Sequence, residues 1–175
     1  MSGIIHTAFF KTGYGELMIG SYEQQLCLCD WRYRKMRSSI DRRIKTALQA
    51  HYVEEDSEVI DETRRQLSRY FAGELTRFDL PLLMIGTDFQ KKVWNQLLRI
   101  PFGKTESYAR LSEKLGDIKA IRAVASANGA NALSIVVPCH RIIGTDGRLT
   151  GYAGGLETKR RLLRLENALR QGELF

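Results

Sequence analysis

The sequence predicts an α+β protein with two domains, a small sheet with helices followed by a mainly helical part. Strand-like runs fill the first third of the chain, and capped helical patterns fill much of the second half. The charge is also uneven. Residues 1–80 hold 12 basic and 12 acidic residues, whereas residues 81–175 hold 15 and 8, which accounts for the net charge of +7. We therefore expect an N-terminal domain of residues 1–85 and a basic domain of residues 86–175, which favours a polyanionic partner.

The N-terminal elements follow from alternation and turn residues. Thr12-Gly13-Tyr14-Gly15 reads as a hairpin turn between two strands. The expected strands are Ile4–Lys11, Glu16–Tyr22, Leu26–Trp31 and a short one at Phe78–Leu82 around Pro81. The expected helices are Arg37–Gln49 and Ile60–Phe71, the second ending at Gly73. No catalytic grouping is visible in this part.

The composition limits the class of protein. Hydrophobic residues make up 43% of 175 residues, which is enough for a buried core. No run approaches the roughly 18 apolar residues of a membrane span. The first ten residues lack the basic segment and cleavage site of a secretory signal. We expect a cytoplasmic protein that does not contact a membrane.

Two of the three cysteines point to packing. An odd number without framework spacing argues against a disulfide scaffold. Cys27 and Cys29 alternate with Leu26 and Leu28, so they share one face of a strand and read as small sheet residues. The spare histidines His6 and His51 have no ligand-like spacing to this pair. We expect no metal site.

The second domain begins with a helix and continues with two shorter ones. Thr87 or Asp88 can cap a helix that runs to Arg99. Ser107 can cap a helix over Tyr108–Leu115, and Asp117 can cap one over Ile118–Asn128 with Gly129 as its stop. This pair has a helix-turn-helix pattern. On the second helix, Lys119, Arg122 and Ser126 lie apart from the face of Ile121, Val124, Ala125 and Asn128. An ordinary pair of core helices would show the same pattern.

Cys139 is the candidate nucleophile. Leu133–Val137 reads as a short strand that Pro138 interrupts just before the thiol. A thiol with a reference pKa of about 8.5 needs a basic or cationic neighbour to become the attacking thiolate. His140 and Arg141 are suitable in type, but adjacency is not contact, and most such Cys-His pairs are structural.

Longer motifs around this cysteine resemble one family. Pro138-Cys139-His140-Arg141-Ile142-Ile143 is similar to the active-site signature of the O6-alkylguanine-DNA alkyltransferases, also called methylated-DNA–protein-cysteine methyltransferases. The resemblance extends over about residues 87–168 and holds only in outline for residues 1–80. It also rests on Phe89-Gln90, Val93-Trp94, Ile100-Pro101-Phe102-Gly103, Ser107-Tyr108, Ala120–Val124, Asn131, Gly151–Leu156 and Glu166. It implies an N-terminal ribonuclease-H-like α/β domain and a C-terminal winged-helix-like domain.

The resemblance also implies the catalytic roles. Cys139 would accept the alkyl group, and His140, polarised by Glu166, would take its proton through a water. Tyr108 would donate a proton to the leaving guanine and help to flip the nucleotide. Asn131 would tie the recognition helix to the cysteine loop. The implied catalytic set is thus Cys139, His140, Glu166, Tyr108 and Asn131.

Further residues are implied for DNA and base contacts. Arg122 would fill the space of the flipped nucleotide, and the DNA-binding set is Arg122, Tyr108, Ala123, Arg141 and Ser126. The base pocket would include Ile142, Tyr152, Ala153 and Gly154, with main-chain groups of Cys139, Ile142 and Ala153 reading the base. Family members often have serine at the position of Ala153, and some have proline at that of Ser134, so the pocket shape may not be carried over unchanged.

The implied reaction is single-turnover repair. The thiolate would displace O6-methylguanine, and also O4-methylthymine, at the alkyl carbon, and the thioether product would consume the protein without a cofactor. The implied partner is double-stranded DNA, bound by a monomer through the minor groove without sequence specificity. Two alternatives stay open. One is a DNA-binding damage sensor or regulator without chemistry, although sensor relatives replace the cysteine. The other is a cysteine hydrolase, which the helix-turn-helix pattern does not support.

Overall fold

The computed structural model describes residues 2–169. The chain forms two compact units, Met1–Gly86 and Thr87–Phe175. Within the described residues, no helix has the length and apolar character needed to cross a membrane. Each unit has its own secondary structure, and the α+β composition expected from the sequence is confirmed.

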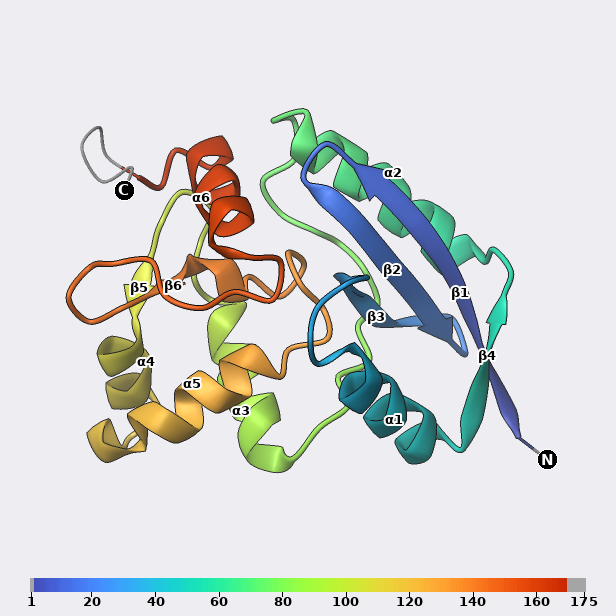
Figure 1. Cartoon of the computed structure of the whole chain (residues 1–175), viewed down its shortest axis with the longest axis horizontal. Helices are drawn as coiled ribbons and strands as arrows, with labels where there is room; N and C mark the ends of the chain where they lie inside the picture. Colours follow the sequence, from blue (N-terminus) through green and yellow to red (C-terminus); the bar gives the residue numbers. More distant parts are fainter. Residues whose placement is uncertain (1, 170–175) are drawn as a thin grey trace. The chain divides into compact units, whose positions relative to one another are not determined.

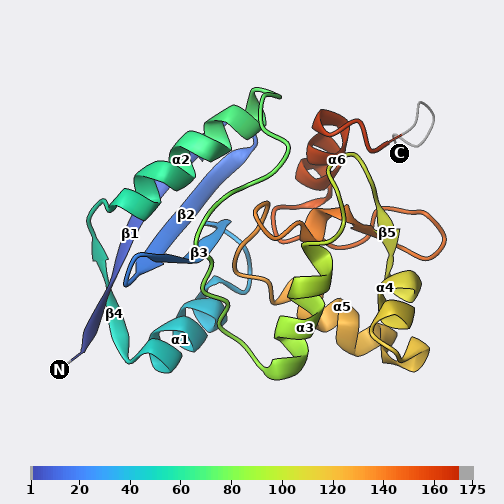
Figure 2. The same ribbon diagram turned by 180° about the vertical axis from the view of Figure 1, so that it is seen from behind.

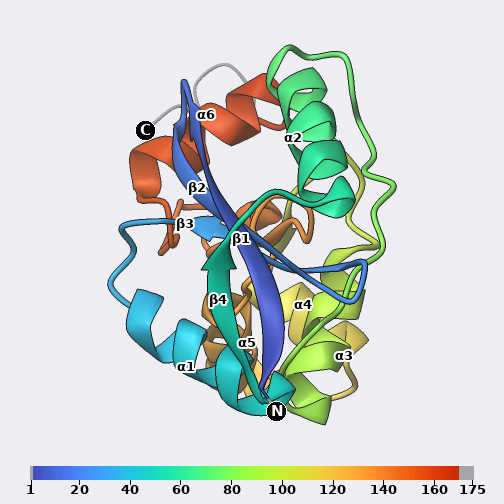
Figure 3. The same cartoon turned by 90° about the vertical axis from the view of Figure 1, so that its right-hand side faces the viewer.

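The N-terminal unit is built on a four-stranded sheet in the order β3-β2-β1-β4. Three antiparallel strands follow one another, and the fourth lies parallel to β1, as Figure 3 shows. The strands are β1 (Gly3–Thr12), β2 (Gly15–Tyr22), β3 (Gln25–Trp31) and β4 (Ala50–Glu54). The Thr12 hydroxyl closes the first hairpin by donating to the Gly15 carbonyl at 2.7 Å and accepting from the Tyr14 amide at 3.0 Å.

Two helices complete this unit, α1 (Arg37–Leu48) and α2 (Glu58–Phe71). Helix α2 lies along the sheet and contacts β1, β2 and β3 (Figure 1). Its start is fixed by Ser57, whose hydroxyl accepts a hydrogen bond from the Ile60 amide at 3.2 Å. Ile60, Leu67 and Tyr70 are buried at helical spacing, so α2 supplies much of the core of this unit.

Two expectations for this unit were wrong. Phe78–Leu82 is not a strand: only an isolated bridge joins Leu26 and Leu82. Pro81 has no N–H to donate, and its carbonyl accepts from the Leu26 amide at 2.7 Å instead. Strand β4 was not predicted because its sequence Ala-His-Tyr-Val-Glu shows little alternation, and only Ala50 is fully buried. Pairing with β1 makes it a strand.

The C-terminal unit consists of short helices linked by structured loops (Figure 2). Its elements are α3 (Asp88–Leu97), β5 (Glu106–Ser107), α4 (Tyr108–Lys114), η1 (Ile118–Ala120), α5 (Ile121–Gly129), η2 (Cys139–Arg141), β6 (Ile142–Ile143) and α6 (Leu156–Leu165). Thr87, Ser107 and Asp117 cap their helices through side-chain oxygens, as predicted. A short parallel pair, β5 and β6, joins the start of α4 to the end of η2.

Two details of this unit differ from the sequence prediction. The second helix of the helix-turn-helix starts as one 3₁₀ turn, η1, and continues through Gly129 to a cap at Ala130, so Gly129 does not stop it. Leu133–Val137 is not a strand but a tight turn, in which the Val137 amide donates to the Leu133 carbonyl at 2.8 Å. Ile135 adopts a φ of 73° at this turn, which is uncommon for a β-branched residue.

Candidate active site and DNA-contacting surface

Cys139 begins a single 3₁₀ turn directly after Pro138 and is only 4% exposed. Its amide donates to the Val137 carbonyl at 2.8 Å, and the Arg141 amide donates to the Pro138 carbonyl at 3.0 Å. The thiol is therefore carried by a rigid bend. The bend itself was expected from Pro138, but its 3₁₀ geometry was not.

His140 and Glu166 are brought together across 26 residues of sequence, with His140 Nε2 and Glu166 Oε2 2.7 Å apart. Both side chains are fully buried. Burial raises the pKa of Glu166, but hydrogen bonds and charges from His140 and Arg141 outweigh it and lower the pKa to about 2. Burial lowers the pKa of His140 more than Glu166 raises it. The pair is therefore an ionised carboxylate beside a neutral imidazole at neutral pH.

The tautomer of His140 follows from this pairing. An ionised carboxylate can only accept, so Nε2 carries the proton and Nδ1 keeps its lone pair. Within residues 2–169, His140 Nδ1 is buried without a hydrogen-bond partner. A basic nitrogen beside Cys139 in sequence is thus left available, either directly or through one water.

Arg141 was expected to contact DNA, and its position argues against that role. The side chain is 8% exposed, and its Nε donates to Glu166 Oε1 at 2.8 Å. Its Nη1 donates to the Ile100 carbonyl at 2.6 Å. These buried bonds occupy the guanidinium, because a charge in a low-dielectric interior needs its partners close by. Arg141 instead fixes Glu166 opposite His140.

Tyr108 reaches the site through the β5–β6 pair. Ser107, the cap of α4, is the register partner of Ile143, which lies four residues after Cys139. Burial raises the pKa of Tyr108, while hydrogen bonding from the Thr150 and Asn128 side chains acts in the opposite direction, and the Cys139 charge adds to the rise. The phenol is therefore protonated at neutral pH, within electrostatic reach of Cys139.

Two buried asparagines connect α5 to the cysteine turn. Asn131 Nδ2 donates to the Val137 carbonyl at 2.9 Å, and its Oδ1 accepts from the Leu133 amide at 2.9 Å. Asn128 Nδ2 donates to the Cys139 carbonyl itself at 3.5 Å. The sequence placed Asn131 in this connection through the family resemblance. It assigned no contact to Asn128, although this residue lies on the apolar face of its helix.

The opposite face of α5 is exposed. Arg122, Ala123 and Ser126 all lie there, whereas Val124 and Ala127 are buried. Trp94 holds the buried side, because its Nε1 donates to the Ala127 carbonyl at 2.8 Å. The surface thus offers two small side chains beside one arginine. This shape permits close approach to a flat or grooved partner.

The predicted base-pocket residues lie on two segments. Ile142 is fully buried in β6, directly after the 3₁₀ turn. Tyr152, Ala153 and Gly154 are half-buried in the loop before α6. The rings of Tyr152 and His140 meet edge to face with centroids 6.4 Å apart. The structure therefore brings this loop against the histidine.

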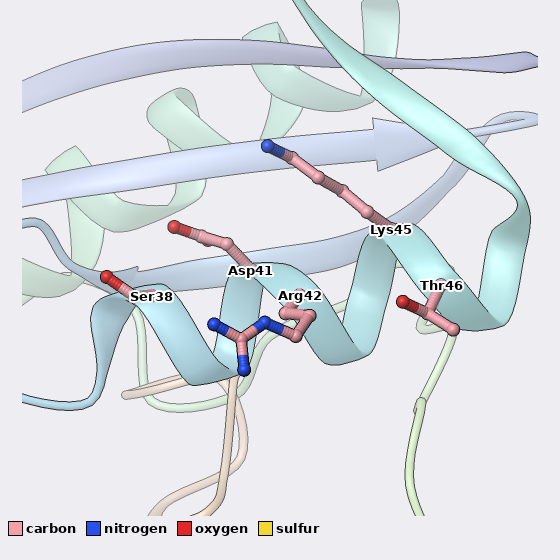
Figure 4. Close-up of a pocket in the computed structure, with 5 residues that line it drawn as sticks. All are labelled: Ser38, Asp41, Arg42, Lys45 and Thr46. Atoms are coloured by element: carbon pink, nitrogen blue, oxygen red, sulfur yellow. The ribbon is translucent and has the colours of Figure 1, made fainter.

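Other reactive or hollow places in the chain lack this arrangement. Burial raises the pKa of Cys27 to about 12 and also raises that of Cys29, so neither is a ready nucleophile. Among the described residues, no group of His, Cys, Asp and Glu side chains could hold a metal ion. A hollow along α1 in the N-terminal unit (Figure 4) is lined by Ser38, Asp41, Arg42, Lys45 and Thr46. Its carboxylate already accepts from the Tyr52 hydroxyl at 2.8 Å.

Sequence reasoning missed one charged residue of this unit. Lys159 is fully buried on α6. Lys159, Leu162, Leu163 and Glu166 are all buried at i, i+3, i+4 and i+7. Two charged residues on the apolar stripe of a helix are the signal that could have identified both Lys159 and Glu166, without any family resemblance.

Comparisons with known proteins agree with this geometry. Residues 5–84 match the family model described as 6-O-methylguanine DNA methyltransferase, ribonuclease-like domain, and residues 88–168 match its DNA binding domain. The methylated-DNA–protein-cysteine methyltransferase of Methanosarcina acetivorans is 52% identical over 114 residues, which cover 65% of this chain and 73% of that protein. The Mycobacterium tuberculosis H37Rv protein of the same name is 53% identical over 109 residues, covering 62% of this chain and 66% of that protein.

A solved structure extends the likeness to both units. The crystal structure of Mycobacterium tuberculosis OGT in complex with DNA superposes with a TM-score of 0.81 at 39% identity, covering 93% of each chain. The expected ribonuclease-like N-terminal domain and DNA-binding C-terminal domain are confirmed. On these matches, this chain belongs to the methylated-DNA–protein-cysteine methyltransferase family.

Proposed function

We propose that this chain repairs DNA by transferring the alkyl group of O6-methylguanine, and of O4-methylthymine, irreversibly to its own Cys139. The observation that carries the proposal is the buried His140–Glu166 pair, 2.7 Å apart, beside a cysteine held in a rigid turn. Family membership supplies the reaction class, and the related OGT was solved in complex with DNA. The site residues take the following roles in this proposal.

The first step is deprotonation of Cys139. His140 Nδ1 receives the thiol proton through a water, and Glu166 stabilises the imidazolium that forms. The thiolate attacks the alkyl carbon, a C–S bond forms, and the bond from that carbon to O6 breaks. The base leaves with the electron pair. Arg141 keeps the carboxylate oriented toward the histidine throughout.

The leaving base gains a proton from Tyr108, whose raised pKa makes it a proton carrier instead of a standing anion. Reaching O6 requires the nucleotide to leave the stack. Arg122 fills the vacated space, and the small residues Ala123 and Ser126 let α5 approach the minor groove closely. Asn131 and Asn128 transmit the position of α5 to the cysteine turn. Main-chain groups of Cys139, Ile142 and Ala153 read the base, with Tyr152 and Gly154 completing the wall.

Several consequences follow for the whole protein. The thioether is stable in water, so each molecule acts once and needs no cofactor. Affinity comes mainly from phosphate contacts by the basic second half, so binding is largely independent of sequence and weakens with salt. We further propose that the protein acts as a monomer on double-stranded DNA in the cytoplasm.

The direct test is a single-turnover assay. The protein is incubated with duplex DNA that carries O6-methylguanine, and its peptides are then weighed. We expect one added methyl group on the Cys139 peptide and a matching loss of the lesion. An intact lesion with unmodified Cys139 would refute the proposal, and release of many product molecules per protein would indicate a hydrolase.

The intercalating role of Arg122 gives a separate prediction. We expect Arg122→Ala to slow repair in duplex DNA by roughly 10- to 100-fold, because nothing then stabilises the gap that flipping leaves. Reaction with free O6-alkylguanine base should change little, since no stack is opened. The measurement compares transfer rates on both substrates. Arg110→Ala, an exposed arginine of α4 paired with Glu113, is the matched control. Equal losses on both substrates would remove the role.

A further inference from the structure

Lys159 is a buried cation that the mechanism above does not use. It lies on α6 and is fully buried. Its Nζ donates to the Thr150 carbonyl at 2.8 Å and to the Gly151 carbonyl at 3.3 Å. Within residues 2–169, no carboxylate lies at ion-pair distance from it. An ammonium ion held by neutral carbonyls alone is costly in an interior, so its retention needs a reason.

The two carbonyls belong to the loop before α6. Thr150 and Gly151 open the segment that continues through Tyr152 and Ala153 to the start of the helix (orange in Figure 1). The Gly155 amide donates to the Tyr152 carbonyl at 3.0 Å, so the loop is closed by its own turn at one end and by Lys159 at the other. Thr150 is also one of the residues whose side chain interacts with Tyr108. Lys159 therefore holds the segment that faces both His140 and Tyr108.

Charge connects Lys159 to the nucleophile as well. Burial lowers the pKa of Lys159 to about 8, and the negative charge of Cys139 acts against that decrease. Lys159 in turn helps to keep the pKa of His140 low. The remaining charges of the site cancel locally, because Glu166 and Arg141 form an ion pair. A thiolate at Cys139 would leave one negative charge without a counter-ion, and Lys159 is the buried cation that faces it.

We propose that Lys159 is a positioning residue of the alkyl-transfer site, whose ammonium pins the Thr150–Gly151 turn and balances the charge of the Cys139 thiolate. This inference rests on the proposed function for its purpose, but not for its measurement. Coupling between two ionisable groups is reciprocal, so each must shift the titration of the other by the same amount.

The first arm of the test measures the thiolate without any DNA. Ultraviolet absorbance at 240 nm is followed against pH, with Cys139→Ser in each background as the blank. We expect Lys159→Met to raise the pKa of Cys139, because the facing positive charge is gone. Lys159→Arg, which keeps the charge, should restore most of it. Arg164→Met, which removes an exposed cation from the same helix, should leave it unchanged. An unchanged titration in Lys159→Met would overturn the charge role.

The second arm uses the unsubstituted lysine and so does not depend on a variant that folds. The side chain of Lys159 is titrated by nuclear magnetic resonance on ¹³C-lysine-labelled protein, before and after Cys139 is replaced with serine. We expect the pKa of Lys159 to fall further in Cys139→Ser, since the opposing thiolate is lost. An equal pKa in both proteins would contradict the coupling.

The third arm separates positioning from simple support of the fold. Lys159→Met should retain or raise the melting temperature, because a desolvated charge is replaced by an apolar chain of similar length. Its single-turnover transfer rate at pH 7.5 should nevertheless fall roughly tenfold, the effect of about one pKa unit on the thiolate population. DNA affinity should not change. A parallel loss of melting temperature and rate would show a structural role only.

The arms also distinguish the two proposals. A chain that shows the reciprocal pKa shifts but transfers no alkyl group keeps the Lys159 coupling and loses the proposed function. A chain that transfers normally in Lys159→Met keeps the function and loses the inference.

Discussion

Cys139→Ser should abolish alkyl transfer, with a decrease on the order of 10⁴-fold or more, while DNA affinity is retained. Serine matches the thiol in shape at this nearly buried position, so the turn should persist. Its hydroxyl, however, stays protonated beside a neutral imidazole, and an alcohol is a far weaker nucleophile toward a saturated carbon than a thiolate. The measurement pairs the lesion-transfer assay with a binding titration on the same duplex.

The matched control for this variant is Cys27→Ala. Cys27 is a buried thiol whose pKa burial raises to about 12, so its removal should not affect transfer. Persistent transfer in Cys139→Ser, or a methyl group found on Cys27 or Cys29, would place the nucleophile elsewhere. Loss of DNA binding together with transfer would mean that the variant had disturbed the fold and not the chemistry alone.

Glu166→Gln should be the second large effect, because it acts on stability and on rate. Removing the carboxylate charge leaves Arg141 as a buried cation without its partner, which costs about 3 kcal/mol of unfolding free energy. The imidazolium of His140 also loses its stabilising charge, so we expect a transfer rate lower by roughly 100-fold. Urea unfolding and single-turnover kinetics measure the two effects. Glu157→Gln, an exposed pair of Arg160 on the same helix, should cost less than about 1 kcal/mol.

The pH dependence of stability gives an independent check on Glu166. Its pKa is lowered from 4.5 to about 2 in the folded protein. The stabilisation is therefore fully present above about pH 4.5 and is lost as the pH falls toward 2. His140 acts in the same direction, since its pKa is lowered from 6.5 and it resists protonation. Glu166→Gln should flatten the acid limb of the stability curve. An acid limb as steep as in the unsubstituted protein would contradict the assignment.

Several parts of the fold could be predicted because their causes are local. The hairpin at Thr12–Gly15 depends on residues within the turn, and the caps Thr87, Ser107 and Asp117 depend on hydroxyl or carboxyl groups beside their own helices. Elements stabilised by distant partners were less accessible. The polar strand β4 exists because β1 offers it a ladder, and the expected strand at Leu133–Val137 was replaced by a turn that Asn131 stabilises.

The active site divides in the same way. The sequence by itself determined the order of the chemistry, since Pro138-Cys139-His140-Arg141 and its flanking motifs indicated a nucleophile, a base and a family. Only the tertiary structure decided which charges meet: Glu166 turns to His140, Arg141 points inward instead of toward DNA, and Lys159 joins the site from a helix whose pattern reads as apolar. The physical reason is that hydrogen bonds and desolvation depend on distances across the fold, which no local pattern contains.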